Sequence, residues 1–200
     1  WRMKSCIKNK VKFNFNIYAT KEIIQKENPD VIIIATGGIP NTDIFESGND
    51  FACSTWDIIS GTVNIEDDVI LFDDNGAYPG LQAAETIINK GSKLEIITPE
   101  RFFSPEIGGL NHVAFAKQFI DHDVLITINK RIKSIEKDGN RLSAIIGSDY
   151  SNTTEKKKTS QIVIEHGTNP NSELYFELKN ESINLGEIDY LSLINGKLIE

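Results

Sequence analysis

Apolar runs and amphipathic stretches alternate through the middle of the chain. Residues 69–72 are an uninterrupted apolar run, typical of a strand buried on both faces of a sheet, and the largely apolar residues 94–97 predict the next strand. Between them, residues 81–90 place apolar side chains on one helical face, and Gly91 is suited to end that helix. This order predicts two parallel strands joined by a right-handed crossover. A second amphipathic pattern predicts another helix over 110–121.

After residue 121, apolar and polar residues alternate, as they do in a half-buried strand. Residues 124–128, 132–137 and 142–146 read as short strands, and the Asp-Gly-Asn between the last two is a strong hairpin signal. A polar loop that runs to residue 160 precedes a further buried strand at 161–165. The predicted fold class is therefore α/β, a Rossmann-like domain in which an antiparallel β-ribbon replaces the last crossover helix.

The N-terminal quarter of the chain gives shorter signals. Residues 11–18 alternate as a half-buried strand does, and the apolar run 31–35 predicts a buried strand. Thr20 is placed to cap a short helix that ends before Asn-Pro, and Ser54 or Thr55 is placed to cap another that ends at a glycine. These elements precede the predicted Rossmann-like domain.

Two segments of the chain repeat one pattern. In 32–45 and in 162–175, an apolar run reaches a glycine and then turns through Pro-Asn. Glycine permits backbone angles that other residues resist, and proline fixes the next bend. We expect the two segments to lie on neighbouring strands, where the chain leaves one domain and later returns to it. The aligned positions are Gly37 with Gly167, Pro40 with Pro170 and Asn41 with Asn171.

The loop 73–80 follows the first strand of the predicted crossover, where a dinucleotide-binding domain carries Gly-x-Gly-x-x-Gly. Gly80 fits the last glycine, and Gly76 fits the second if the loop is one residue longer. Asp74 or Asn75 stands at the first position. Two interpretations follow, a working nucleotide site or a degenerate loop that is only structural.

Two electrostatic energies can be compared for this loop, and they favour the degenerate interpretation if a carboxylate points inward. A helix N-terminus stabilises an anion by about 0.3–1 kcal/mol, or about 2 when partly buried. One carboxylate about 4 Å from a phosphate charge opposes it by about 4 kcal/mol at an effective dielectric of 20. The acidic pairs 67–68 and 73–74, however, are each expected to be solvated strand ends rather than acid/base machinery.

The end of the second strand carries two further candidates. Glu100 lies where an acid would hydrogen-bond an adenosine ribose, and Arg101 could meet a 2′-phosphate instead. The alternative is that both residues form a charged strand exit. We assign no catalytic residue.

Composition narrows the classes of partner and ligand. The chain is 25% charged and 40% hydrophobic, with a net charge of −8 and a pI of about 5.0. No basic cluster favours nucleic acid, and no apolar run has the length of a membrane span. Cys6 and Cys53 match no metal spacing, and the three histidines show no ligand pairing, so no metal site is predicted. His166 is expected to form a side-chain hydrogen bond at the domain junction.

Several motifs together resemble one family of enzymes. They are similar to motifs in the C-terminal half of the NADH:flavin oxidoreductases, which include trimethylamine and dimethylamine dehydrogenases, N-methylproline demethylases and 2,4-dienoyl-CoA reductase. The resemblance covers nearly the whole chain. The motifs are 30–41, 54–61, 73–76, 99–101, 105–112, 165–171 and 184–190.

The resemblance implies a larger parent enzyme. Such proteins carry an N-terminal barrel with FMN, an iron–sulfur (4Fe-4S) cluster and a flavin- or ADP-binding domain, and this chain lacks their signatures. We therefore expect a fragment, with 1–46 ending the flavin/ADP domain, 47–166 forming the NAD(P)-binding-like domain and 167–200 returning to the first. The resemblance also marks Thr36, Gly37 and Gly38 as cofactor-binding residues, beside Asn75, Gly76, Gly80, Glu100 and Arg101.

The resemblance further suggests function, cofactors and partners. We expect a cytoplasmic flavin-dependent oxidoreductase that acts on a methylated amine. An NAD(P)H-dependent enoyl reductase is the alternative within enzymes, and a docking domain without nucleotide is the alternative outside them. No cofactor is expected to bind tightly to the fragment, and NAD(P)H or ADP would bind weakly. The expected partners are the missing barrel and flavin/ADP domain, with an electron-transfer protein as a further candidate, and neither nucleic acid nor membrane is expected.

Overall fold

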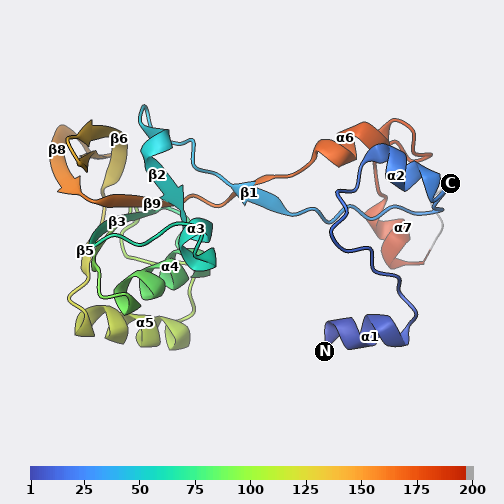
Figure 1. Cartoon of the computed structure of the whole chain (residues 1–200), viewed down its shortest axis with the longest axis horizontal. Helices are drawn as coiled ribbons and strands as arrows, with labels where there is room; N and C mark the ends of the chain where they lie inside the picture. The colour runs from blue at the N-terminus through green and yellow to red at the C-terminus, as the bar shows by residue number, and fades with distance from the viewer. Residues whose placement is uncertain (197–200) are drawn as a thin grey trace. The chain divides into compact units, whose positions relative to one another are not determined.

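The structure, a computed structural model, describes residues 1–196 and divides the chain into two compact units (Figure 1). Unit 2 is the continuous stretch Gly38–Asn169. Unit 1 combines Trp1–Gly37 with the chain from Pro170 onward. Within residues 1–196, no helix has both the length and the apolar character that crossing a membrane requires.

A five-stranded parallel sheet forms the centre of unit 2. Each neighbouring pair of strands is parallel, and the predicted strands at 69–72, 94–97 and 161–165 are confirmed. The chain runs outward through β3, β4 and β5 and then returns to the other side of β3. The strand order is β2 (Ala52–Ser54), β9 (Gln161–Glu165), β3 (Asp68–Asp73), β4 (Lys93–Ile97) and β5 (Leu125–Thr127).

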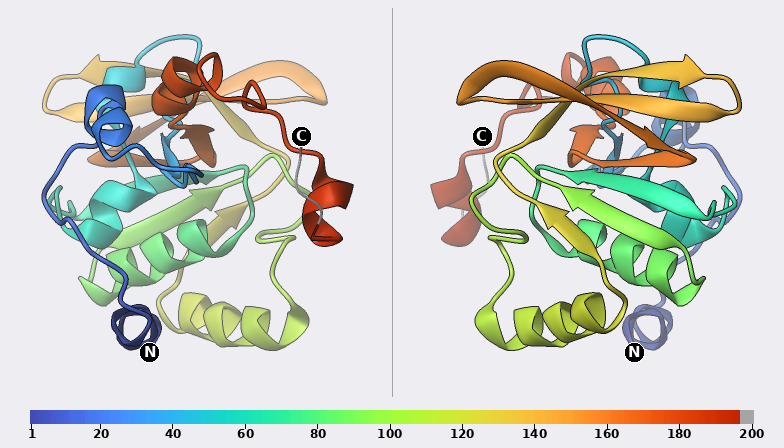
Figure 2. Two further views of the ribbon diagram at one scale, coloured as in Figure 1. Left: turned by 90° about the vertical axis from the view of Figure 1, so that its right-hand side faces the viewer. Right: turned by 90° about the vertical axis from the view of Figure 1, so that its left-hand side faces the viewer.

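Different elements cover the two faces of this sheet (Figure 2). Helices pack on one face, and a three-stranded antiparallel ribbon packs on the other. The ribbon connects β5 to β9, where a crossover helix would otherwise run. The helices are α3 (Thr55–Ser60), α4 (Tyr78–Asn89) and α5 (Gly109–Asp121), and the ribbon strands are β6 (Arg131–Asp138), β7 (Arg141–Ser148) and β8 (Ser151–Thr159).

Successive residues of β3 supply both cores. Val69 and Leu71 pack with the helices, whereas Ile70 and Phe72 pack with the ribbon. All four side chains are at most 2% exposed. Burying an apolar side chain of this size stabilises the fold by about 1.5–3 kcal/mol, so the double-sided burial explains the uninterrupted apolar run.

Local signals set the ends of the helices in unit 2. The Ser54 hydroxyl accepts from the Asp57 N–H at 3.2 Å, and the Asp57 carboxylate accepts from the Ser54 N–H at 2.9 Å. This capping box confirms the predicted cap, and Gly61 ends the helix at φ 75°. Helix α4 begins at Tyr78, earlier than the predicted residue 81, because Pro79 suits a first helical turn.

Of the predictions for the following segments, one is confirmed and one is wrong. The predicted strand at 124–128 is present as β5, which pairs parallel with β4 and extends the central sheet. The predicted polar loop up to residue 160 contains β8, which pairs antiparallel with β7. Most of β8 is exposed, so its sequence lacks the apolar alternation that would reveal a strand. The hairpin between β6 and β7 is confirmed, with Gly139 at φ 63°.

The two Pro-Asn motifs pair with each other, as predicted. Strands β1 (Gly38–Pro40) and β10 (Thr168–Pro170) form a two-stranded sheet. The Asn41 N–H donates to the Gly167 carbonyl at 3.1 Å, and the Asn171 N–H donates to the Gly37 carbonyl at 2.9 Å. The ladder is therefore antiparallel, with the two glycines at its opposite ends.

Unit 1 consists of short helices and irregular chain. Thr20 caps its second helix, as predicted, by accepting from the Ile23 N–H at 3.5 Å. The predicted strands at 11–18 and 31–35 are wrong, because neither pairs with another strand within residues 1–196. Ile33 is accordingly 87% exposed. The helices are α1 (Arg2–Lys8), α2 (Lys21–Lys26), α6 (Glu173–Lys179) and α7 (Tyr190–Ile194).

Candidate nucleotide-binding site

The carboxyl ends of β3 and β9 mark the point where the strand order of the sheet reverses. Ligands of open α/β sheets bind at such a switch point. A short loop after Asp73 leaves β3 here and leads into α4, whose first turn contains Gly80. Three of the predicted site residues, Asn75, Gly76 and Gly80, thus lie in this loop and the helical turn that follows it.

The side chain of Asp73 organises this loop from the inside. Its Oδ1 accepts from the Asn75 N–H at 3.0 Å and from the Gly76 N–H at 2.8 Å. Asp73 is 5% exposed, and burial raises the pKa of its carboxyl group to about 7, despite the opposing hydrogen bond from Gly76. The expectation that Asp73 is a solvated strand end is therefore wrong, because its own loop folds over it.

Gly76 in the loop and Gly80 in the first turn of α4 are both enclosed by their neighbours. A Cβ on residue 80 would lie 2.7 Å from the Asp73 Cγ, so the carboxyl group rests directly against the first turn of α4. Gly76 has φ 65°, and a Cβ there would lie 2.7 Å from the Pro105 Cγ. The Glu106 N–H donates to the Gly76 carbonyl at 3.2 Å, which holds the segment after β4 against the loop.

Glu165, at the end of β9, is a second buried carboxylate at this edge. It is 4% exposed and accepts from the Asn75 side-chain amide at 3.0 Å and from the Gly167 N–H at 3.0 Å. The Thr55 hydroxyl donates to its other oxygen at 2.5 Å. Neither Glu165 nor Thr55 was a predicted site residue, because only the parallel pairing of β9 with β3 brings them to the loop.

Asp74 joins the loop to the ribbon. Its side chain is 11% exposed, so the expected solvated strand end is wrong here also. The His166 Nδ1 lies 2.6 Å from the Asp74 Oδ1, and the Arg131 guanidinium lies 3.8 Å from the Asp74 Oδ2. The expected side-chain hydrogen bond of His166 is thus present, with Asp74 as its partner. Arg131 also binds Asp149, at 3.2 Å.

The other predicted site residues lie outside this loop. Glu100 and Arg101 are exposed in the turn after β4, where the Glu100 N–H donates to the Thr98 hydroxyl at 3.3 Å. Thr36 and Gly37 belong to unit 1, and Gly38 opens β1. The Thr36 hydroxyl donates to the Asn171 carbonyl at 2.6 Å, so its observed role is to support the chain next to the ladder.

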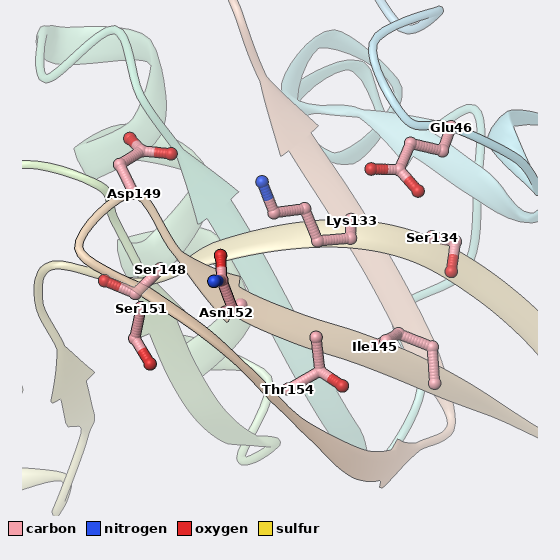
Figure 3. A pocket seen from close by; sticks show the side chains of 10 residues that line it. Glu46, Lys133, Ser134, Ile145, Ser148, Asp149, Ser151, Asn152 and Thr154 are labelled. Carbon is pink, nitrogen blue, oxygen red and sulfur yellow. The ribbon is translucent and has the colours of Figure 1, made fainter.

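A separate polar hollow of about 480 Å³ lies on the ribbon (Figure 3). Lys133 contributes an amine, and Glu46 and Asp149 contribute carboxylates. The alkyl stem of Lys133 lies over Gly147, where a Cβ would be 3.0 Å from the Lys133 Cε. Because both signs of charge line an open surface, this hollow is a weaker candidate than the loop at the switch point. Residues 1–196 contain no cluster of three or more His, Cys, Asp or Glu side chains arranged to hold a metal ion.

Comparison with known proteins places the chain among flavin enzymes. No protein-family model matches it. It is 46% identical over 197 residues to a probable N-methylproline demethylase of Rhizobium meliloti (strain 1021), a match that covers 98% of this chain and 29% of the relative. Over nearly its whole length the chain is similar to one region of enzymes of the NADH:flavin oxidoreductase type.

Two further relatives extend this family. An N,N-dimethylglycine/sarcosine dehydrogenase of Chromohalobacter salexigens is 28% identical over 200 residues, with 96% of this chain and 29% of the relative covered. Among solved structures, a complex of 2-naphthoyl-CoA reductase superposes with a TM-score of 0.76 at 22% identity, over 92% of this chain and 26% of that chain. The latter likeness shows the fold alone. The chain thus spans 29% of the length of each of the two curated relatives.

Proposed function

We propose that this chain supplies a nucleotide-binding-like domain to a flavin-dependent oxidoreductase that removes hydride equivalents from a methylated amine. The 46% identity to a probable N-methylproline demethylase over 98% of the chain carries this proposal. The second curated relative is named for N,N-dimethylglycine and sarcosine, which are also N-methylated amino acids. Both names describe the same class of substrate, a tertiary or secondary amine that bears a methyl group.

Unit 2 is proposed as the Rossmann-like domain of that enzyme. The five-stranded parallel sheet, the reversal of strand order between β3 and β9 and the loop into α4 support this assignment. The ribbon β6–β8 takes the place of the last crossover helix. Unit 1 is proposed as part of a second domain, which other parts of a longer polypeptide would complete, because the relatives are more than three times as long as the matched region.

We further propose that unit 2 holds no flavin. A flavin or pyridine dinucleotide is bound through backbone N–H groups at the loop before α4, and the hydrogen bonds from Asn75 and Gly76 to Asp73 support this proposal. We therefore propose that FMN and an iron–sulfur cluster are held elsewhere in the full-length protein. The flavin supplies the hydride acceptor when bound, and the residues of this chain provide the adjoining framework.

Oxidation of the methyl group predicts a simple product test. Loss of hydride from an N-methyl carbon gives an iminium, and water then releases formaldehyde and the demethylated amine. The full-length protein that contains this sequence should release formaldehyde from N-methylproline in the presence of a redox dye, with proline as the matched control. Equal signals from N-methylproline and proline, or turnover of neither, would contradict the proposed substrate class.

A further inference from the structure

We propose that Asp73 is a specificity-determining residue that closes the nucleotide loop of unit 2 with a carboxylate of the chain itself. In this arrangement the carboxylate takes the place of a dinucleotide phosphate, and Pro105 covers the loop from outside. The inference rests on the proposed function only in treating unit 2 as a nucleotide-binding-like domain. It assigns to this domain a built-in exclusion of NAD(P)H and ADP.

The hydrogen-bond donors of the loop are the first argument. A helix N-terminus binds phosphate through backbone N–H groups that point at the ligand. In this loop, the N–H groups of Asn75 and Gly76 point at Asp73 Oδ1, at 3.0 and 2.8 Å. The carboxylate of Asp73 is thus the anion that the loop is built around.

The space beside Gly80 is the second argument. The last glycine of a dinucleotide motif lets the helix pack closely on the strand. Here the same absence of a Cβ makes room for the Asp73 carboxyl group, whose Cγ would lie 2.7 Å from a Cβ on residue 80. The glycine that the sequence shares with nucleotide-binding loops therefore accommodates a side chain rather than a ligand.

The outer side of the loop is the third argument. A glycine in the middle of a phosphate loop lets the pyrophosphate approach the backbone. The open side of Gly76 faces the ring of Pro105 instead, with the Pro105 Cγ 2.7 Å from the position of a Cβ. The neighbouring residues Ser104 and Ile107 are buried, so this cover is part of the packed structure.

The charges around the loop also disfavour a bound phosphate. Glu165 is buried at the end of the neighbouring strand, and Asp74 follows Asp73 directly. The guanidinium of Arg131 lies 3.8 Å from the Asp74 carboxylate, and the His166 ring is hydrogen-bonded to the same carboxylate. A phosphate that entered the loop would therefore meet carboxylates before it met a free cation of this cluster.

Three variants of the full-length protein test this inference. Asp73→Gly removes the carboxylate and its volume, Asp73→Asn removes the charge and keeps the volume, and Asp67→Asn removes an exposed charge at the opposite end of the strand. Calorimetric titration with NADH and with ADP-ribose at pH 8 reports binding directly, without any requirement for amine oxidation. The titration can therefore be interpreted even if the proposed substrate class is wrong.

We expect the wild-type protein and Asp67→Asn to bind NADH with a Kd weaker than about 1 mM. Asp73→Gly should bind at least about tenfold more tightly than Asp67→Asn, with Asp73→Asn in between. A wild-type Kd below about 10 μM that Asp73→Gly does not tighten would overturn the exclusion. So would equal affinities in Asp73→Asn and Asp67→Asn together with no gain in Asp73→Gly. If Asp73→Gly fails to fold, the isosteric Asp73→Asn and the wild-type titration decide the question.

Discussion

The carboxyl group of Asp73 lies against Gly80. It occupies the space beside this glycine that a Cβ on any other residue would need. The Cγ of Asp73 is 2.7 Å from the position of such a Cβ, too close for two carbon atoms that are not bonded. The strand end and the first turn of α4 are therefore matched to each other through one side chain and one missing side chain. This match is the structural basis of the closed loop.

Gly80→Ala should destabilise the protein by about 1–3 kcal/mol, because the added methyl group overpacks the space that Asp73 fills. Adding Asp73→Gly should recover part of this loss, since the two changes act on one contact. Chemical denaturation of both single variants and the double variant measures the coupling. Gly109→Ala is the matched control, because Gly109 also opens a helix and a Cβ there meets nothing within 4 Å. Simple additivity of the two changes would contradict the contact.

The raised pKa of Asp73 predicts a pH-dependent difference in stability. Its pKa is about 7 in the folded protein against 3.8 for an ordinary Asp, so the folded state binds the extra proton between these values. The free energy of unfolding contributed by this group therefore falls as pH rises from about 4 to 7, by at most about 4 kcal/mol. The Asp73→Asn variant has no titratable group at this position, so its free energy of unfolding does not decrease for this reason.

The corresponding measurement is denaturation of wild type and Asp73→Asn at pH 5 and pH 8. The stability of Asp73→Asn relative to wild type should rise by about 1–3 kcal/mol between the two pH values. Asp67→Asn serves as the control, since Asp67 is exposed. A difference that stays constant with pH would show that Asp73 titrates normally.

The ion pair of Glu95 with Lys157 should stabilise the packing of the ribbon on the sheet. Lys157 Nζ lies 2.6 Å from a Glu95 oxygen, and the Thr127 hydroxyl donates to the same oxygen at 2.6 Å. Glu95 is 9% exposed, so Lys157→Ala leaves a buried carboxylate with fewer partners and should cost about 1–3 kcal/mol.

Lys158 provides the matched control for this pair. It binds Asp138 at 2.8 Å, but its side chain is 62% exposed, so Lys158→Ala should cost less than about 1 kcal/mol. Thermal denaturation of the two variants gives the comparison. Equal losses would mean that the Glu95 pair contributes no more than a surface contact.

The strands of the parallel sheet could be predicted because their signal is local. Each residue of 69–72 is buried against one of two cores, and the uninterrupted apolar run reflects this directly. The strand β8 could not be predicted, because its polar residues adopt a strand conformation only through pairing with β7. The run 31–35 shows the opposite case, a strand-forming sequence that finds no partner within residues 1–196.

The turn between β3 and α4 could be predicted from the sequence, but its interior could not. The spacing of Gly76 and Gly80 indicated a tight turn and close packing, which the structure contains, whereas nucleotide binding at this turn stays a prediction. The direction of the Asp73 side chain depends on the N–H groups of its own loop, and the approach of Pro105 depends on tertiary packing. Neither is visible in residue spacing, which is why both interpretations of the loop remained open at the level of sequence.

The absorbance of the flavin in the full-length protein under anaerobic conditions tests the proposed function and the closed loop together. The protein should lose its oxidised flavin absorbance when N-methylproline is added and should keep it when NADH is added in the same excess. Bleaching by NADH without bleaching by N-methylproline would contradict both the methylated-amine substrate and the exclusion of pyridine nucleotide by Asp73.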